Sequence, residues 1–326
     1  MDHKVLAEHA ERQVNVLGEE AKERRRQVNY LRDGLTSYIH DHPDYDLVKL
    51  RASGSTAKHT AIRRHRGEGS DADVAAYVRT NDLDVAEAGL LEWLCERCIG
   101  VYGKTKVADD FVISDHAVGI TLRHSGLKID VAPVLYTGEP DDKGYLITRQ
   151  GDRVLTSVTQ HLQFIRLRKE KAGPGYRELI RLLKAWIRES KRQDPDLRCK
   201  SFLIELIVAH LWDNGWNGEM LQVEDYPRAF EQVLAYIVRT GLTSPIVFDD
   251  FYDSADVAAS TDPIQVWDPV NPTNNVARSY ADHHRIRLVD RAAASLDEIS
   301  WAATAPGAGA VNEAWRTLFG PSFAGA

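Results

Sequence analysis

The sequence predicts an α+β protein of two lobes. Up to about residue 150, short apolar segments alternate with turn residues, which is typical of β-strands. Beyond that point apolar residues recur at helical spacings, and Gly and Pro break the pattern into separate helices. A chain of 326 residues is long enough to form both lobes. We therefore expect a mixed-sheet lobe over residues 1–150 and a helical lobe over residues 151–326.

The first lobe should begin with one long amphipathic helix over residues 5–38, where apolar residues are spaced by three, four and seven. DLVKLRASGS, residues 46–55, predicts a short strand that leads into a Gly-Ser turn. ADVAAYVRT, residues 72–80, predicts a second strand. Residues 84–100 predict a helix, and residues 106–137 predict further strands separated by turns.

The second lobe should consist of helices that end at Gly or Pro. The final stretch, APGAGAVNEAWRTLFGPSFAGA, is rich in Gly and Ala, and we expect a flexible C-terminal tail there. The expected helices cover residues 156–172, 175–193, 201–215, 226–240 and 282–304.

Composition limits the class of protein. The sequence has no run of about 18 apolar residues and its N-terminus has no apolar signal core, so we expect neither a membrane span nor membrane binding. Three cysteines predict a reducing, cytoplasmic setting without a disulfide framework. The net charge is −7, yet residues 166–192 hold ten Lys or Arg against three Glu, and residues 58–66 are also basic. Such local patches favour a polyanionic ligand, with solvated helix faces as the alternative.

Three carboxylates suggest the chemistry. Asp71 and Asp73 are one residue apart in a predicted strand, so their side chains should project from one face. Asp130 lies in the apolar segment GLKIDVAPVL, where an unpaired charge is costly to bury. If the two strands are neighbours, the three carboxylates converge into a site that suits Mg²⁺, with Mn²⁺ as an alternative ion. Two such ions can activate a hydroxyl and stabilise leaving pyrophosphate.

The Gly-Ser turn supplies a second feature. Gly54 would let the backbone approach a phosphate closely, and the amide and hydroxyl of Ser55 could donate to its oxygens. A strand, a phosphate-binding turn, a strand with paired aspartates and a later strand with one aspartate form the layout of a nucleotidyl-transfer site.

At these residues the chain resembles the polymerase beta-type nucleotidyltransferases, and more narrowly the cGAS/DncV-like nucleotidyltransferases (CD-NTases) and the 2′-5′ oligoadenylate synthetases. The first lobe carries the resemblance in SDADVAAYV, residues 70–78. The second carries it in residues 179–212 and in VWDPVNPTNNVA, residues 266–277. The resemblance implies a nucleotidyltransferase palm with an active site in the cleft between the lobes.

The resemblance also implies roles for individual residues. Asp71, Asp73 and Asp130 would be the catalytic metal ligands, with Asp130 as the base for the attacking hydroxyl. Gly54 and Ser55 would hold the β- and γ-phosphates.

Three residues of the second lobe would bind the nucleotide. Lys184 and Ser201 would hold the triphosphate, and Phe202 would stack on a base. Each has a structural alternative: Lys184 as a solvated charge, Ser201 as a helix N-cap, and Phe202 as part of the core.

The activity that the resemblance implies is the joining of ATP, alone or with GTP or another NTP, into a cyclic di- or trinucleotide for antiphage (CBASS-type) signalling. One alternative is a linear 2′-5′ oligoadenylate synthetase activated by double-stranded RNA, and another is an inactive nucleotide-binding regulator. Regulation through a protein partner or conjugation at the C-terminus would fit the same family.

Two further segments are not part of the predicted site. The basic loop at residues 63–69 makes the distance from the Gly-Ser turn to Asp71 longer than we expect for the family. Cys95 and Cys98 have metal-type spacing but lie in a helical pattern without a second pair, so core thiols are favoured over zinc or redox chemistry.

Overall fold

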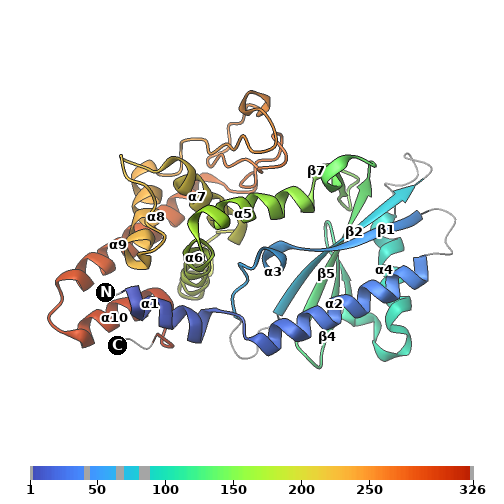
Figure 1. The fold of residues 1–326 in the computed structure, drawn as a ribbon, viewed down its shortest axis with the longest axis horizontal. Helices are drawn as coiled ribbons and strands as arrows, with labels where there is room; N and C mark the ends of the chain where they lie inside the picture. The colour runs from blue at the N-terminus through green and yellow to red at the C-terminus, as the bar shows by residue number, and fades with distance from the viewer. Residues whose placement is uncertain (1–2, 40–44, 64–69, 81–88, 324–326) are drawn as a thin grey trace. The chain divides into compact units, whose positions relative to one another are not determined.

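The structure is a computed structural model that describes residues 3–39, 45–63, 70–80 and 89–323. The chain forms two compact units: Val16–Gln163, here the sheet unit, and Met1–Asn15 with Phe164–Ala326, here the helical unit (Figure 1). The predicted α+β class with a mixed sheet and a set of helices is confirmed. Every helix in the described ranges falls short of the length and apolarity that crossing a membrane requires.

The sheet unit is built on a seven-stranded sheet with the order β1-β2-β5-β4-β3, and β6 and β7 extend it beside β5. One pairing, β2 with β5, is parallel, and the others are antiparallel. The strands are β1 Tyr45–Ser53, β2 Ser70–Thr80, β3 Phe111–Ile113, β4 Val118–Leu122, β5 Leu127–Tyr136, β6 Gly144–Ile147 and β7 Arg153–Thr156.

The two faces of this sheet differ. One face carries alternate apolar residues of β2 and β5, such as Val74 and Val131, and packs against α2 (Gly18–Ile39) and α4 (Leu90–Tyr102). The opposite face carries a small apolar cluster at one end, where Tyr77 and Val134 meet the start of α5 (Val158–Ala172). The other end of that face is polar, and the predicted carboxylates lie there.

The N-terminal helix differs from the prediction. The structure has α1 (His3–His9), a π-helical turn η1 (Ala10–Val14) and then α2, with an extended backbone at Asn15. The break coincides with the division between units. An apolar stripe continues through it, so periodicity alone predicts one helix, although the two parts pack on different cores.

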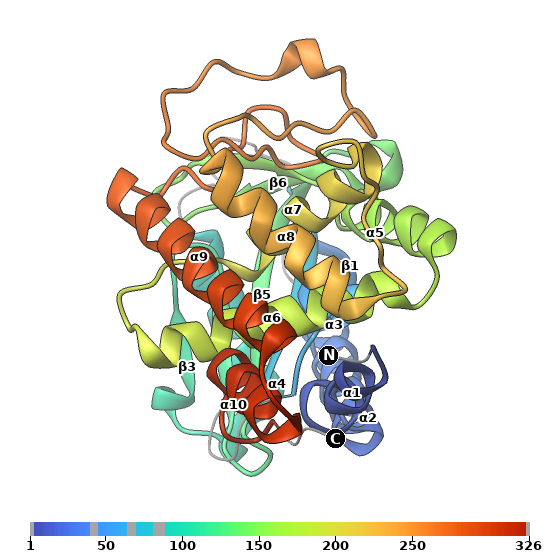
Figure 2. The same ribbon diagram turned by 90° about the vertical axis from the view of Figure 1, so that its left-hand side faces the viewer.

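The helical unit has a continuous apolar core. Trp186, Tyr176, Phe230 and Trp315 are among its largest fully buried side chains, and the indole nitrogen of Trp186 donates to Ser295 Oγ at 3.0 Å. The strongly amphipathic pattern of residues 175–193 and 226–240 produces this packing. Besides α1, η1 and part of α5, the helices described in this unit are α6 Gly175–Gln193, α7 Ser201–Asn214, α8 Tyr226–Thr240, the short 3-10 helix η5 Ser254–Asp256, α9 Asp282–Thr304 and α10 Ala308–Phe319 (Figure 2).

The predicted boundary and tail both differ from the structure. The division lies beyond residue 150 because β7 pairs with β6 and the start of α5 packs on the sheet. The Gly/Ala-rich end forms α10, whose Trp315 and Phe319 rings are stacked 5.9 Å apart. Phe323 is also buried, so the expectation of a flexible tail is wrong through that residue. Residues 324–326 lie outside the described residues.

Candidate functional site

Asp73 and Asp130 lie directly beside each other on neighbouring strands. The parallel pairing of β2 and β5 puts Asp73 in register with Asp130 and Asp71 in register with Lys128. The antiparallel pairing of β1 and β2 puts Ser53 on the other side of Asp73. Because side chains alternate along a strand, all these residues share the polar face. The structure therefore brings the three predicted aspartates onto one end of one face.

Gly54 follows Ser53 and begins the short helix α3 (Gly54–Lys58). Its φ is +61°, and a methyl group on its Cα would lie 1.9 Å from Asp73 Oδ2. Glycine is thus required here by the backbone conformation and by the closeness of a carboxylate. The sequence predicted close approach of Gly54 to a phosphate, whereas the close approach that the structure shows is to Asp73.

Ser55 lies in the first turn of α3 and is half-buried. Its carbonyl oxygen accepts from the amides of Thr60 at 2.9 Å and Ala61 at 3.1 Å, which closes the turn after α3. The role of Ser55 toward phosphate stays a prediction.

Helix α3 is tied to its surroundings by side chains. Thr56 Oγ1 donates to the backbone oxygen of Asp71 at 3.4 Å, and Arg24 Nη1 donates to Thr56 Oγ1 at 3.4 Å. Arg24 is buried and paired with Glu20 at 2.5 Å. A residue of α2 therefore fixes α3 against β2, and no local sequence motif predicts this link.

Asp130 has a cationic neighbour on its own strand. Lys128 Nζ lies 2.9 Å from Asp130 Oδ1, and 46% of the Lys128 side chain and 30% of that of Asp130 are exposed. Lys128 is not among the site residues predicted from the sequence. Its i−2 spacing from Asp130 is the signal that could have found it, because residues two apart in a strand share a face.

The donor set fits a divalent cation in its chemistry. Two strands offer three carboxylates on one face, and hard oxygen ligands of this kind suit Mg²⁺. Their side chains are not gathered for it: among the described residues no three Asp, Glu, His or Cys side chains are grouped closely enough to hold a metal ion.

A second charged group occupies the same face of the sheet further along. Asp142 accepts hydrogen bonds from Lys49 and from Thr159 and lies 3.0 Å from Arg51. Burial opposes ionisation of Asp142, but the hydrogen bonds from Lys49 and Thr159 and the charge of Arg51 hold its pKa below the ordinary value. The Lys49 ammonium also lies 4.5 Å from the ring centre of Tyr136. No sequence pattern predicted this group, because its members come from distant segments.

The predicted residues of the helical unit have definite surroundings. Lys184 on α6 is 4% exposed and its Nζ lies 2.5 Å from Glu205 Oε1 on α7. It is therefore not a solvated charge. Ser201 is exposed and is the first residue of α7, while the N-cap is Lys200, so the N-cap alternative for Ser201 is wrong. Phe202 is half-buried. The nucleotide-binding roles of all three stay predictions.

The Asp-Pro, Asn-Val segment at residues 266–277 forms a hydrogen-bonded loop. Asn275 is buried, and its Oδ1 accepts from the amides of Val266 at 3.1 Å and Ala277 at 3.0 Å. Asp268 Oδ1 accepts from the amide of Val270 at 2.9 Å. These side chains therefore hold a long irregular segment in one shape.

The cysteines are core residues. Cys95 and Cys98 lie on α4 within the main apolar core of the sheet unit. Burial raises the pKa of the Cys98 thiol, and it raises that of Cys199 in the helical unit to about 12. Buried protonated thiols match the core interpretation.

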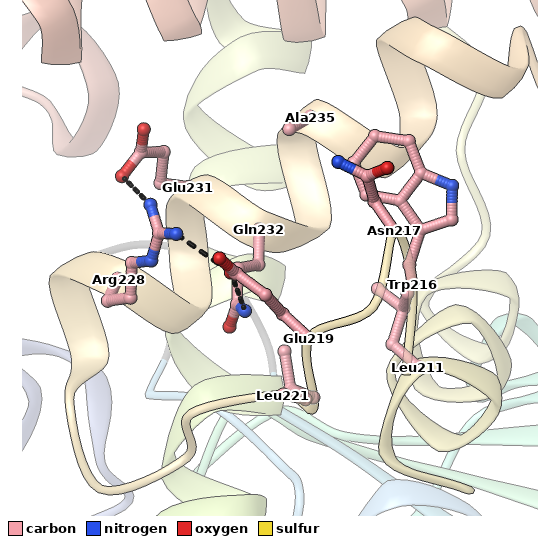
Figure 3. Close-up of a pocket in the computed structure, with 9 residues that line it drawn as sticks. All are labelled: Leu211, Trp216, Asn217, Glu219, Leu221, Arg228, Glu231, Gln232 and Ala235. Carbon is pink, nitrogen blue, oxygen red and sulfur yellow. Dashed lines mark hydrogen bonds and ion pairs between the residues drawn. The ribbon is translucent and has the colours of Figure 1, made fainter. Parts of the chain in front are cut away.

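A pocket of about 140 Å³ lies in the helical unit beside α8 (Figure 3). Arg228 lies between Glu219 at 2.8 Å and Glu231 at 3.3 Å and closes one side. Trp216 and Leu211 contribute apolar surface on the other. None of the site residues predicted from the sequence lines this pocket. The three predicted aspartates lie on the polar face of the sheet, which is the candidate catalytic site.

Comparisons with known proteins show which proteins this chain is similar to. The family model for 2′-5′-oligoadenylate synthetase 1, domain 2, C-terminus, matches residues 146–317. A cyclic AMP-AMP-AMP synthase of Escherichia coli (strain MS 115-1) is 38% identical over 326 residues, covering 100% of this chain and 98% of the relative. The CBASS oligonucleotide cyclase CdnC of Escherichia coli (strain KTE188) is 31% identical over 304 residues, covering 91% and 89%.

Solved structures show the same fold. CdnC of E. coli MS115-1 with ATP matches with a TM-score of 0.86 at 38% identity, covering 100% of this chain and 99% of that one. Vibrio cholerae DncV cyclic AMP-GMP synthase matches with a TM-score of 0.74 at 12% identity, covering 99% and 97%, and shows the fold alone. The chain therefore belongs to the cGAS/DncV-like nucleotidyltransferases, among the CdnC-type cyclic oligonucleotide synthases.

Proposed function

We propose that the enzyme joins ATP into cyclic triadenylate for CBASS-type antiphage signalling in the cytoplasm, with Mg²⁺ or Mn²⁺, and releases pyrophosphate. Full-length likeness to a cyclic AMP-AMP-AMP synthase and to an ATP-bound CdnC supports ATP as the substrate and a trinucleotide as the product. A mixed product with GTP or another NTP, or a cyclic dinucleotide, is the alternative outcome.

The observation that carries the proposal is the register of Asp73 with Asp130 beside the Gly54 turn. Asp71, Asp73 and Asp130 would hold the divalent cations, which supply positive charge to the attacking hydroxyl and the leaving pyrophosphate. A carboxylate oxygen of Asp130 would accept the proton of that hydroxyl. Gly54 and Ser55 would lie against the β- and γ-phosphates.

The helical unit would contribute to nucleotide binding through α7. Ser201 is exposed at the first position of this 14-residue helix, where backbone amides favour a phosphate. Phe202 beside it would meet a base. The ammonium of Lys184 already pairs with the carboxylate of Glu205. Lys184 would therefore contribute to nucleotide binding by linking α6 to α7.

A regulatory protein would control this activity. Support comes from the solved complex of E. coli MS115-1 CdnC with a HORMA protein, which matches this chain with a TM-score of 0.86 at 37% identity. Conjugation through the C-terminus would have to use residues beyond Phe323, because Phe323 itself is buried.

The test is a product analysis. The protein is incubated with each of four labelled ribonucleotides and Mg²⁺ or Mn²⁺, alone and with a HORMA partner, then treated with phosphatase and analysed by mass spectrometry. We expect a phosphatase-resistant trimer of AMP from ATP, and its loss in Asp73→Asn. Full synthesis by Asp73→Asn would overturn the assignment of the site.

A second candidate is a linear 2′-5′ oligoadenylate synthetase, which the family model over residues 146–317 favours. In that case phosphatase would remove the terminal phosphates of the product, and double-stranded RNA would stimulate turnover in a salt-dependent manner. A chain that has lost catalysis would bind ATP and form neither product.

A further inference from the structure

Lys128 and Asp130 form an ion pair on the face where the metal ligands are expected. The ammonium of Lys128 lies 2.9 Å from Asp130 Oδ1, and Lys128 is the register partner of Asp71 on β2. The positive charge of Lys128 therefore lies among the carboxylates, bonded to one and on the strand position beside another. Such a charge reduces the repulsion between close carboxylates.

The neighbouring strand leaves room for this pair. Gly119 on β4 is the register partner of Asp130, and Thr121 is that of Lys128. A methyl group on the Gly119 Cα would lie 2.8 Å from Lys128 Cε and 3.1 Å from Asp130 Oδ1. The φ of Gly119 is not in the left-handed region, so backbone conformation does not require glycine here. The absence of a side chain at residue 119 gives the Lys128 stem its place.

The pair places a positive charge where a divalent cation would lie. A carboxylate has lone pairs for both an ammonium and a metal ion, but an ammonium 2.9 Å from Asp130 Oδ1 repels a cation bound to the same carboxylate. Both partners are partly exposed, and an exposed ion pair is weak enough to be displaced.

We propose that Lys128 is a stand-in cation: in the resting enzyme its charge offsets part of that of the carboxylates and opposes a divalent cation at Asp130, and it moves away when such a cation binds. Removing its charge then strengthens divalent-cation binding in the absence of nucleotide. With nucleotide present, the negative triphosphate compensates the displaced ammonium, so Lys128 makes assembly of the metal site depend on substrate. The inference rests on the proposed role of the aspartates.

The test is a titration of the full-length protein with Mn²⁺ alone, without nucleotide, in which free Mn²⁺ is followed by electron paramagnetic resonance. We expect Lys128→Gln to bind Mn²⁺ roughly tenfold more tightly than the wild type, because a like charge within a few ångströms is removed. Lys128→Met, which also lacks the charge, should shift equally, and Lys128→Arg should stay near the wild type. Lys22→Gln is the matched control, because it breaks an exposed pair with Glu19 on α2.

The outcomes distinguish failure of the role proposed for Lys128 from failure of the proposed metal site. Unchanged or weaker Mn²⁺ binding by both Lys128→Gln and Lys128→Met, with wild-type binding that Asp73→Asn weakens, overturns the stand-in role alone. Equal Mn²⁺ binding by the wild type and Asp73→Asn removes the proposed metal site itself. If Lys128→Arg shifts as much as Lys128→Gln, the effect is steric and the proposal is also overturned.

Discussion

Asp73 shows how closely the candidate site is packed around one carboxylate. Ser53 and Asp130 are its neighbours on the flanking strands, and the Gly54 Cα lies against its oxygen. The sequence motif shows only that a glycine precedes paired aspartates. The structure adds that the glycine and one of the aspartates touch, so that the shape of the turn and the position of the carboxylate depend on each other.

Gly54→Ala should therefore damage both stability and activity. The positive φ costs an L-residue about 1–2 kcal/mol, and the added methyl group would collide with Asp73. We expect a lower melting temperature and a large loss of product formation. Gly18→Ala is the control, since nothing lies within 4 Å of a methyl group there and its φ is not positive. An unchanged rate for Gly54→Ala would mean that Asp73 need not be held where it is.

The Lys184–Glu205 pair makes a second prediction at this scale. Lys184→Met leaves the buried Glu205 carboxylate without its ammonium, so we expect a loss of about 3–5 kcal/mol in the free energy of unfolding. Replacing both residues, by Met and Leu, should restore most of the stability. If Lys184 also acts on the triphosphate, the stable double variant will show a raised KM for ATP. An unchanged KM would leave Lys184 a structural residue only.

At the scale of elements, the pairing of β2 with β5 matters most. It is the parallel pairing of the sheet, and its register places Asp73 opposite Asp130, which are remote in sequence. A slip of one residue would move one carboxylate to the apolar face beside Val74 and Val131. The apolar alternation on that face therefore fixes the register, and with it the spacing of the candidate catalytic carboxylates.

Helix α10 is expected to stabilise the helical unit. Trp315 is buried and its ring contacts Phe230 and Phe319 at centroid distances of 6.1 and 5.9 Å. Trp315→Ala should lower the free energy of unfolding by about 3–5 kcal/mol, measured by denaturant titration. Trp301→Ala is the matched control because that side chain is 49% exposed, and it should change little. A small effect at Trp315 would show that the C-terminal segment is not packed as described.

Helix α1 predicts a pH dependence. His9 is buried against Phe323 at a ring distance of 4.8 Å, and burial and then the charge of Arg188 lower its pKa to about 4. As the pH falls, His9 is protonated in the unfolded chain before it is protonated in the folded protein. The stability that neutral, buried His9 allows is therefore fully present above about pH 6.5 and is lost as the pH drops toward 4. We expect the free energy of unfolding to fall by about 2–3 kcal/mol over this pH range, and His9→Leu should reduce this pH dependence. An equal slope in the variant would assign the effect to other groups.

At the scale of the whole molecule, the sequence predicted what depends on local pattern. The strands around Asp73 and Asp130 and the helices over 226–240 and 282–304 are confirmed. The prediction failed where tertiary packing decides. Residues 3–15 join the helical core although their apolar stripe continues into α2, and α10 is stabilised by aromatic contacts that outweigh its Gly and Ala content. The sequence could not predict the partners of Lys128, Arg24 and Asp142. Those partners are set by strand register or come from segments that are far apart in the chain.

The most direct measurement of the central claim is anomalous diffraction from crystals grown with Mn²⁺ and a non-hydrolysable ATP analogue. The account predicts manganese peaks within coordination distance, roughly 2–2.5 Å, of oxygens of Asp73 and Asp130, with Lys128 Nζ no longer bonded to Asp130. A bound analogue with no manganese at these two carboxylates, or manganese held by other residues, would contradict it.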